Sequence, residues 1–231
     1  GKDGAGDLRD NGKFYFLNEL KHGYHLTVDD DIIYPPDYIQ KLILKIEQYN
    51  RQALVGVHGV IFDQPIERFF KGRTVYGFYR EQVRDAFVNL IGTGTLAYHT
   101  DTIQLNLSDF TEHGMADVFV AIQAKQSGIP IICVKRPMGW LEAMDSDEEE
   151  GDTLWDEFQH ADHLQTALVQ AESPWDTMVY TSEFTDWVGE LLANNSLVAL
   201  ALHGYDVSRM AQIGLPESTG PVPVGLRSLP S

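Results

Sequence analysis

The sequence has few of the features that mark a disulfide-bonded or membrane-spanning chain. Of its 231 residues only Cys133 is a cysteine, which excludes a disulfide within the chain and favours a reducing compartment. The longest apolar runs, such as residues 197–202, are far shorter than the roughly 18 residues that span a bilayer. Residues 1–10 are polar and lack the pattern of a secretory signal. We therefore expect no transmembrane segment.

Basic residues are scarce in the second part of the chain. The net charge is −17; residues 137–231 hold 2 Lys and Arg against 17 Asp and Glu, whereas residues 1–136 hold 15 against 17. Such an acidic surface repels phosphate polymers, so we expect no nucleic acid partner. The nearly neutral first part can hold an anionic small ligand. Glycine and proline (20 and 10) are too few for a low-complexity chain, and 43% apolar residues are typical of a folded protein.

Short β-prone runs alternate with helical patterns over residues 1–140, which predicts an α/β fold with parallel strands in its sheet. We expect strands at 24–28, 53–62, 95–98 and 129–135, and helices at about 39–49, 80–90 and 115–127. Gly128 follows the last helix at a position typical of a helix C-terminus.

The rest of the chain divides into an acidic segment with a helical appendage, 141–213, and a Gly/Pro-rich tail or linker, 214–231. Residues 142–162 include ten acidic residues and no Lys or Arg, which indicates a solvated loop or helix start. Apolar stripes within 164–171 and 180–192 predict two helices that dock on the α/β part.

Three adjacent carboxylates, Asp29, Asp30 and Asp31, follow the first β-prone run. Neighbouring like charges raise the cost of ionisation unless a cation lies among them, and carboxylate oxygens suit Mg²⁺ or Mn²⁺. Because side chains alternate along a strand, Asp29 and Asp31 are expected on one side, where both can bind one ion. The alternative is an acidic turn whose carboxylates accept hydrogen bonds from backbone N–H groups or cap the next helix.

The flanks of the triplet, YHLTVDDDIIYPPDYI, resemble the DxD segment of GT-A glycosyltransferases, in particular bacterial enzymes related to glycosyltransferase family 2. The resemblance implies a partial GT-A fold, a Rossmann-like mixed sheet flanked by helices. It implies that Asp31 binds the Mn²⁺ or Mg²⁺ that bridges the diphosphate of a nucleotide-sugar. Asp29 is expected to hold the ribose or sugar of the donor and to share the metal, with Asp30 in the variable middle position of this donor site.

A second segment, MADVFVAIQAKQSG, is similar to the helix that carries the catalytic base in this family. Asp117 opens it, and Gly128 follows eleven residues later. The family has Glu-Asp where this chain has Ala116 and Asp117. The resemblance implies that Asp117 takes the proton of the attacking hydroxyl, with Glu112 as a second candidate. The alternative is a first-turn acid that the helix dipole favours.

Weaker likenesses point to other residues of the donor site. Gly94, in GTGTLAY, matches the glycine-bearing strand beside the donor sugar, and Asp10 and Lys13, in RDNGKF, match a stretch that helps to hold the donor. The alternatives are an ordinary strand entry and a solvated lysine. His58 lies near the site or is a packed core histidine, and Trp140 stacks on an acceptor sugar or closes the core.

The resemblance implies a metal-dependent enzyme that moves a sugar from a nucleotide-diphosphate donor to a hydroxyl of a glycan or glycolipid. No Gln-x-x-Arg-Trp pattern is present, so we expect non-processive transfer. The resemblance further implies inverting transfer in capsule or lipopolysaccharide synthesis, in the bacterial cytoplasm with peripheral membrane contact. Only 28 residues precede the triplet, so the nucleotide-binding opening strands have no counterpart and we expect a fragment of a longer transferase. The alternatives are a Mg²⁺-dependent nucleotidyltransferase-like enzyme and a non-catalytic acidic interaction module.

Overall fold

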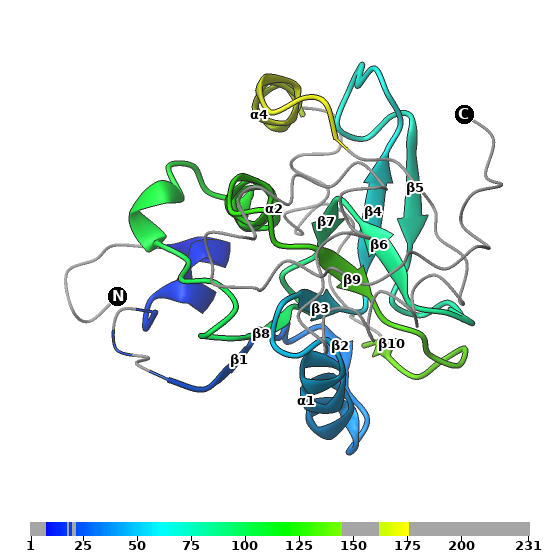
Figure 1. The fold of residues 1–231 in the computed structure, drawn as a ribbon. Helices are drawn as coiled ribbons and strands as arrows, with labels where there is room; N and C mark the ends of the chain where they lie inside the picture. Colours follow the sequence, from blue (N-terminus) through cyan, green and yellow to red (C-terminus); the bar gives the residue numbers. More distant parts are fainter. Residues whose placement is uncertain (1–7, 18, 20–21, 145–161, 176–231) are drawn as a thin grey trace, which may run out of the picture.

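A computed structural model describes residues 8–17, 19, 22–144 and 162–175, which form a mixed α/β structure (Figure 1). Within these residues, three sheets contain the strands and three α-helices pack around them. In chain order the elements are η1 (Arg9–Phe14), β1 (Tyr24–Leu26), β2 (Ile32–Ile33), α1 (Tyr38–Gln48), β3 (Leu54–Gly56), β4 (Gly59–Phe62), β5 (Arg73–Tyr76), β6 (Ala86–Val88), β7 (Leu90–Ile91), β8 (Ala97–His99), η2 (Leu107–Asp109), α2 (Ala116–Gln126), β9 (Ile131–Cys133), β10 (Glu142–Ala143) and α4 (His163–Ala171).

The largest sheet has the strand order β1-β8-β3-β9-β6 and is mixed. Strand β3 runs parallel to β9, whereas β8 is antiparallel to both of its neighbours and β6 is antiparallel to β9. Two smaller sheets, β5-β4-β7 and β10-β2, flank it. The α/β class and the mixed sheet expected from the sequence are therefore confirmed.

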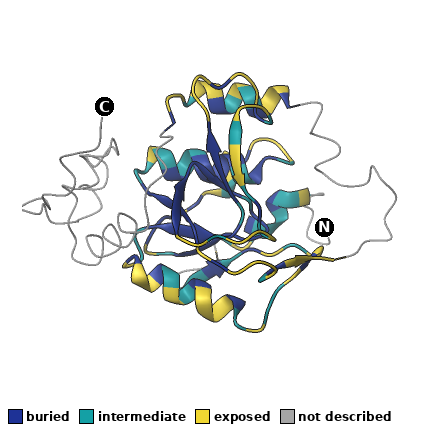
Figure 2. Cartoon of the chain, turned by 90° about the vertical axis from the view of Figure 1, so that its right-hand side faces the viewer, coloured by how far each residue is buried: buried dark blue, intermediate teal, exposed yellow. Residues whose placement is uncertain are grey.

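Both faces of the large sheet are buried, as the alternation of its side chains shows. Leu54 and Ile131 belong to the hydrophobic cluster on the α2 side, whereas Val55 and Ile132 belong to the cluster on the α1 side. Because successive strand residues point to opposite faces, a continuous apolar strand needs a cover on each face. In Figure 2 the inner strands of the large sheet are dark blue, and exposed residues, in yellow, gather on the outer sides of the helices and in loops.

The helices on the two faces begin and end where the sequence predicts. Helix α1 follows Pro35 and Pro36 and buries Leu42 and Ile46 at helical spacing, which confirms the expected amphipathic helix. Helix α2 ends before Gly128, whose φ of 68° lies in the left-handed region that glycine tolerates. The N–H of the next residue, Ile129, then donates to the carbonyl of Ala124 at 2.8 Å.

The helix expected at 80–90 is wrong. This stretch contains β6 and the first residue of β7, and Phe87 pairs with Ile132 of β9. Phe87 and Val88 belong to different hydrophobic clusters, so the two side chains point to opposite faces of the sheet. Such a short apolar run is typical of a buried strand, and its apolar content alone does not favour a helix.

The strand expected at 53–62 is interrupted in the middle. Strand β3 lies in the large sheet and β4 in the small β5-β4-β7 sheet, and the chain changes sheets at Val57 and His58. The hydroxyl of Thr95 accepts hydrogen bonds from both backbone N–H groups, at 3.2 Å from Val57 and 2.9 Å from His58. A side chain from the glycine-bearing segment 92–95 therefore takes the place of a strand partner at the break.

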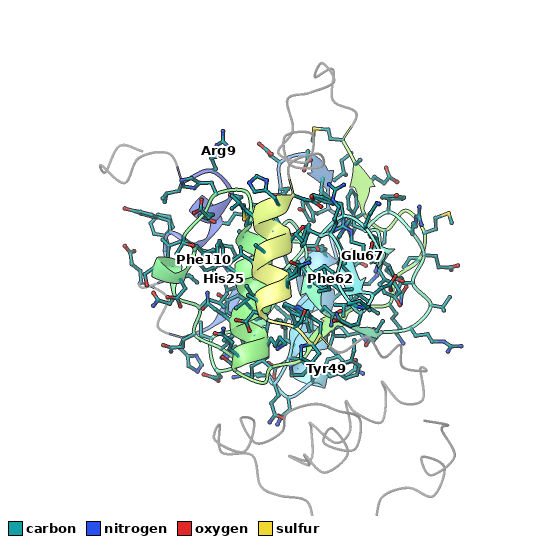
Figure 3. The ribbon with its side chains drawn as sticks, turned by 90° about the horizontal axis from the view of Figure 1, so that it is seen from above. Arg9, His25, Tyr49, Phe62, Glu67 and Phe110 are labelled. Atoms are coloured by element: carbon teal, nitrogen blue, oxygen red, sulfur yellow. The ribbon has the colours of Figure 1, made fainter. Side chains whose placement is uncertain are left out.

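Helix α4 confirms the first of the two helices expected behind the acidic segment, and it docks on the α/β part. Asp162 forms an ion pair with Arg68 at 2.7 Å, and the Thr166 hydroxyl accepts from the Phe69 N–H at 2.9 Å. Trp175 packs edge-on against Phe62, with ring centroids 5.5 Å apart. In Figure 3, α4 lies between the labelled Phe110 and Phe62.

Residues on both sides of the expected boundary at 140/141 pack together. Strand β10 pairs with β2, and Val169 of α4 belongs to the same hydrophobic cluster as the strands. Most of the acidic segment, the helix expected at 180–192 and the tail at 214–231 lie outside the described residues. Among the residues described, none of the helices has the length and apolar character to cross a bilayer.

Candidate functional site

The Asp29–Asp31 triplet lies in the turn between β1 and β2. Strand β1 ends at Leu26, so the strand alternation that was expected to place Asp29 and Asp31 on one side does not apply. Asp29 is half-buried, whereas Asp30 and Asp31 are exposed. In the described part of the chain, no hydrogen bond or ion pair engages the carboxylates of Asp30 and Asp31. The turn thus presents two free carboxylates beside a fixed one.

Asp29 is fixed by two residues, Lys13 and Tyr34. Its carboxylate forms an ion pair with the ammonium of Lys13. Its backbone N–H donates to the Tyr34 hydroxyl at 2.8 Å, and that hydroxyl donates to the Gly94 carbonyl at 2.6 Å. Burial raises the pKa of Tyr34 to about 12, so the hydroxyl stays protonated at neutral pH. Tyr34 therefore ties the Asp29 turn to the glycine-bearing segment.

Gly94 allows the close approach of the Asp29 carboxylate. A Cβ atom at position 94 would fall on the Asp29 side chain, with only 2.8 Å to Cγ. Because Lys13 holds that carboxylate, the side chain has little freedom to move aside. The structure therefore brings together three residues that the sequence assigns to the donor site, Gly94, Asp29 and Lys13.

We predict that Gly94→Ala displaces the Asp29 carboxylate and weakens the metal-dependent nucleotide binding expected from the sequence at least about tenfold, the loss of one charge-assisted contact. Gly92→Ala is the matched control, because its Cβ would meet the His58 ring at an ordinary 3.6 Å. Calorimetric titration of both variants with UDP and Mn²⁺ measures the difference. Equal affinities of the two variants would show that the contact between residues 94 and 29 does not shape the site.

Asp10 has a structural position that the sequence did not predict. Its two carboxylate oxygens accept hydrogen bonds from the backbone N–H groups of Gly114, at 2.7 Å, and Ala116, at 2.9 Å. These N–H groups belong to the entry and the first residue of α2, where unpaired donors need an acceptor. Asp10 thus caps α2 from a distant part of the chain, and both of its oxygens are occupied.

Asp117 lies in the first turn of α2, one residue after the N–H that Asp10 binds. Its side chain is partly exposed, and Oδ1 accepts from the Val118 N–H at 2.8 Å. Burial raises the pKa of Asp117 to about 6; the Val118 hydrogen bond and the charge of Arg73 act in the opposite direction, and the charge of Asp10 adds to the rise. A carboxylate of this pKa is ionised at neutral pH and is still basic enough to take a proton.

Segment 10–13 joins the two carboxylate sites. Asp10 binds the start of α2, where Asp117 lies, and Lys13 binds Asp29. Both residues belong to the short helix η1, whose Phe14 is fully buried in the core. One rigid element therefore sets the position of Asp117 relative to the Asp triplet.

Two further candidates from the sequence, His58 and Trp140, have contacts with other groups. The His58 ring packs against Gly92, and burial, together with the charges of Arg73 and Arg136, lowers its pKa to about 4. Trp140 packs beside α1, where its indole N–H donates to Asp37 at 3.0 Å. The charge of Asp117 acts on Arg73 of β5. The sequence did not indicate this residue, because its position depends on the pairing of β5 with β4.

The carboxylates of the triplet suit a hard divalent cation that keeps some of its coordination sites for a substrate. Asp29 and Asp31 offer carboxylate oxygens, and Mg²⁺ or Mn²⁺ commonly binds one or two carboxylates together with substrate phosphates. Within the described ranges, the group of three converging ligands lies elsewhere, at His22, His99 and Asp101. There Arg51 already pairs with Asp101 at 3.3 Å, and the Asp101 N–H donates to His99 Nδ1 at 3.0 Å.

No protein-family model matches the chain, and no curated sequence matches it significantly.

Proposed function

We propose that the chain carries the donor and base sites of a metal-dependent glycosyltransferase of the GT-A type. The observation that supports this most is the link made by η1, which holds Asp29 through Lys13 and the start of α2 through Asp10. A transferase needs a carboxylate pair for a metal–diphosphate and a separate carboxylate for the acceptor hydroxyl, set at a fixed distance. The mixed sheet with helices on both faces agrees with such a fold.

Each carboxylate has a role in this proposal. Asp29 and Asp31 would hold Mn²⁺ or Mg²⁺, and the bound ion offsets the charge that develops on the leaving diphosphate. Asp117 accepts the proton of the acceptor hydroxyl as that oxygen attacks the anomeric carbon. Since the Val118 N–H holds Oδ1, the proton goes to Oδ2. Lys13 and Tyr34 keep the triplet in place, and attack from the face opposite the leaving group gives inversion.

Calorimetric titration of UDP and GDP into the purified chain, with and without Mn²⁺, tests the proposal. We expect binding that needs the metal and is lost in the Asp29→Ala/Asp31→Ala double variant, because the variant lacks both proposed metal ligands. Asp101→Ala is the control, since it removes an exposed carboxylate from the His22–His99–Asp101 group.

Two outcomes of this titration would contradict the proposal. Metal-dependent binding that survives in the double variant but is lost in Asp101→Ala would transfer the metal to the histidine group. Absence of nucleotide binding by the folded chain would make the triplet an acidic turn and would contradict the proposed function.

A further inference from the structure

Two histidines and an aspartate meet beside the paired strands β1 and β8. The two strands are antiparallel, and their register, continued by two residues, sets His22 opposite Asp101. The pairing extends past the strand ends, because the Thr100 N–H donates to the Gly23 carbonyl at 2.9 Å. Since side chains alternate along a strand, His99 lies on the same face as Asp101. The backbone pairing therefore brings three metal-binding side chains to one place.

The spacing of these side chains is close to that of a tetrahedral zinc site. The His22 Nε2 atom is 3.5 Å from Oδ1 of Asp101, and the His99 Nδ1 atom is 3.2 Å from Oδ2. One ligand atom from each of the three residues lies within 4.8 Å of the other two. Nitrogen and oxygen ligands bound at about 2.0 Å to a tetrahedral ion lie about 3.3 Å apart, so shifts of roughly 1.5 Å or less complete the set. The side chains of His22 and Asp101 are 69% and 48% exposed, and both can make such a shift.

His99 is the fixed member of the group. Its side chain is buried, and the Tyr24 ring lies edge-on to it with centroids 4.9 Å apart. Tyr24 is held in turn by Glu47, which accepts from its hydroxyl at 2.8 Å. The Nδ1 atom of His99 accepts from the Asp101 N–H at 3.0 Å. A metal ion on Nδ1 would replace this hydrogen bond, and because Asp101 is a surface residue, water can then accept from its N–H.

Arg51 is the cation that competes for Asp101, but Glu47 holds it more closely. The Nε and Nη2 atoms of Arg51 donate to the two oxygens of Glu47 at 2.7 and 3.3 Å, whereas Nη1 reaches Oδ2 of Asp101 at 3.3 Å. Oδ1, the oxygen that faces His22, has no other hydrogen-bond or ion-pair partner in the described part of the chain. Glu47 therefore balances the charge of Arg51, and the Asp101 carboxylate remains available to a metal ion.

We propose that His22, His99 and Asp101 bind a Zn²⁺ ion, at a second metal site separate from the Asp29–Asp31 triplet. Imidazole nitrogens favour Zn²⁺, whereas carboxylates alone favour Mg²⁺ or Mn²⁺. Three protein ligands, two of them exposed, leave the fourth tetrahedral position to water. In the described sheet β1 is an edge strand, with β8 as its one neighbour. The ion therefore fastens the strand that leads into the triplet turn, and it does so whether or not the chain is a glycosyltransferase.

Calorimetric titration of the metal-free full chain with Zn²⁺, at about pH 7.5 where free imidazole is neutral, tests the inference. We expect a saturable site whose Kd rises at least about tenfold in His22→Ala and in Asp101→Ala, because each variant lacks one ligand. His113→Ala is the matched control, since it removes an exposed histidine outside the group. Thermal unfolding is the second readout. Saturating Zn²⁺ should raise the Tm of the wild type and of His113→Ala more than that of either ligand variant.

Zn²⁺ binding that is absent in the wild type, or unchanged in either ligand variant, would overturn the inference. An equal loss in His113→Ala would do the same, because it would show that histidines bind zinc without a common site. The Asp29→Ala/Asp31→Ala double variant should bind Zn²⁺ like the wild type, and loss of zinc binding there would assign the ion to the triplet instead. Since this titration contains no nucleotide, its result does not depend on whether the chain binds UDP.

Discussion

Asp117→Asn is expected to reduce sugar transfer roughly 10²- to 10⁴-fold, the usual contribution of a general base, without loss of the fold. The amide oxygen can still accept the Val118 N–H, so the first turn of α2 keeps its hydrogen bond. The amide cannot take the proton of the acceptor hydroxyl. Binding of UDP and Mn²⁺ should remain unchanged, because the proposed donor contacts come from the triplet turn. Product formation from a nucleotide-sugar, measured once an acceptor is known, checks the prediction.

The same substitution should raise stability at neutral pH. The pKa of Asp117 is about 6 in the folded chain, above the ordinary value of 3.8, so the folded state holds this proton more tightly than the unfolded state. The free energy of unfolding of the wild type therefore falls as pH rises from about 4 to 6. Asp117→Asn removes this loss of stability, which is on the order of 3 kcal/mol above pH 6. Thermal unfolding should show equal stability near pH 4 and a more stable variant at pH 7.

Glu112→Gln is the control for both effects. Glu112 is exposed, and the contact made to it by Asn11 is to its backbone carbonyl, at 3.0 Å, so the substitution removes a carboxylate near α2 without a structural loss. Full activity of Asp117→Asn together with loss of activity in Glu112→Gln would transfer the base role to Glu112. The activity of the wild type should also fall below about pH 6, as Asp117 becomes protonated.

Asp85→Ala is expected to destabilise the chain by about 3–5 kcal/mol, as does the loss of one partner from a buried ion pair. Asp85 is 4% exposed and accepts from Lys45 at 2.5 Å, from the Tyr49 hydroxyl at 2.9 Å and from the Lys135 N–H at 2.7 Å. These contacts tie the C-terminal half of α1 to the chain that leaves β9. The substitution leaves the ammonium and both other donors without this acceptor.

Urea unfolding of matched lysine variants provides the comparison. Lys45→Met should lower the free energy of unfolding by a similar amount, because it leaves the Asp85 carboxylate without its cation. Lys41→Ala, one turn earlier on α1, removes an ion pair with Asp37 in which both side chains are about half exposed. The free energy of unfolding should therefore change by no more than about 1 kcal/mol. A loss of less than 1 kcal/mol in Asp85→Ala would mean that the pair contributes little to the folded state.

Elements with a strong local pattern could be predicted from the sequence. Helix α1 has apolar residues at helical spacing, and α2 ends at a glycine, so both could be placed within a few residues. The stretch 80–90 could not, because its strands depend on pairing with β9 and β4, which come from distant parts of the chain. The break at His58 depends in the same way on the Thr95 hydroxyl.

The candidate site shows the same division. The run of three carboxylates made the Asp triplet visible in the sequence, and the position at the start of a predicted helix that ends at Gly128 made Asp117 visible. The partners that fix them are distant in the chain: Asp10 caps α2, and Tyr34 joins Asp29 to Gly94. A cap supplied from a distant residue has no local signature. Arg73 also has no local signature, because the strand that carries it has an ordinary hairpin pattern.

The pairing of distant strands in the large sheet has a consequence for the order of folding. Its inner pairs join β3 to β9 and β8, and its edge joins β1 to β8, so each contact closes a long loop. The entropy of closing such loops must be offset before the contacts stabilise anything, which makes sheets of this kind slow to form. The β4–β5 hairpin is local by comparison and can form early. The hairpin that carries Arg73 would then exist before the rest of the site assembles around it.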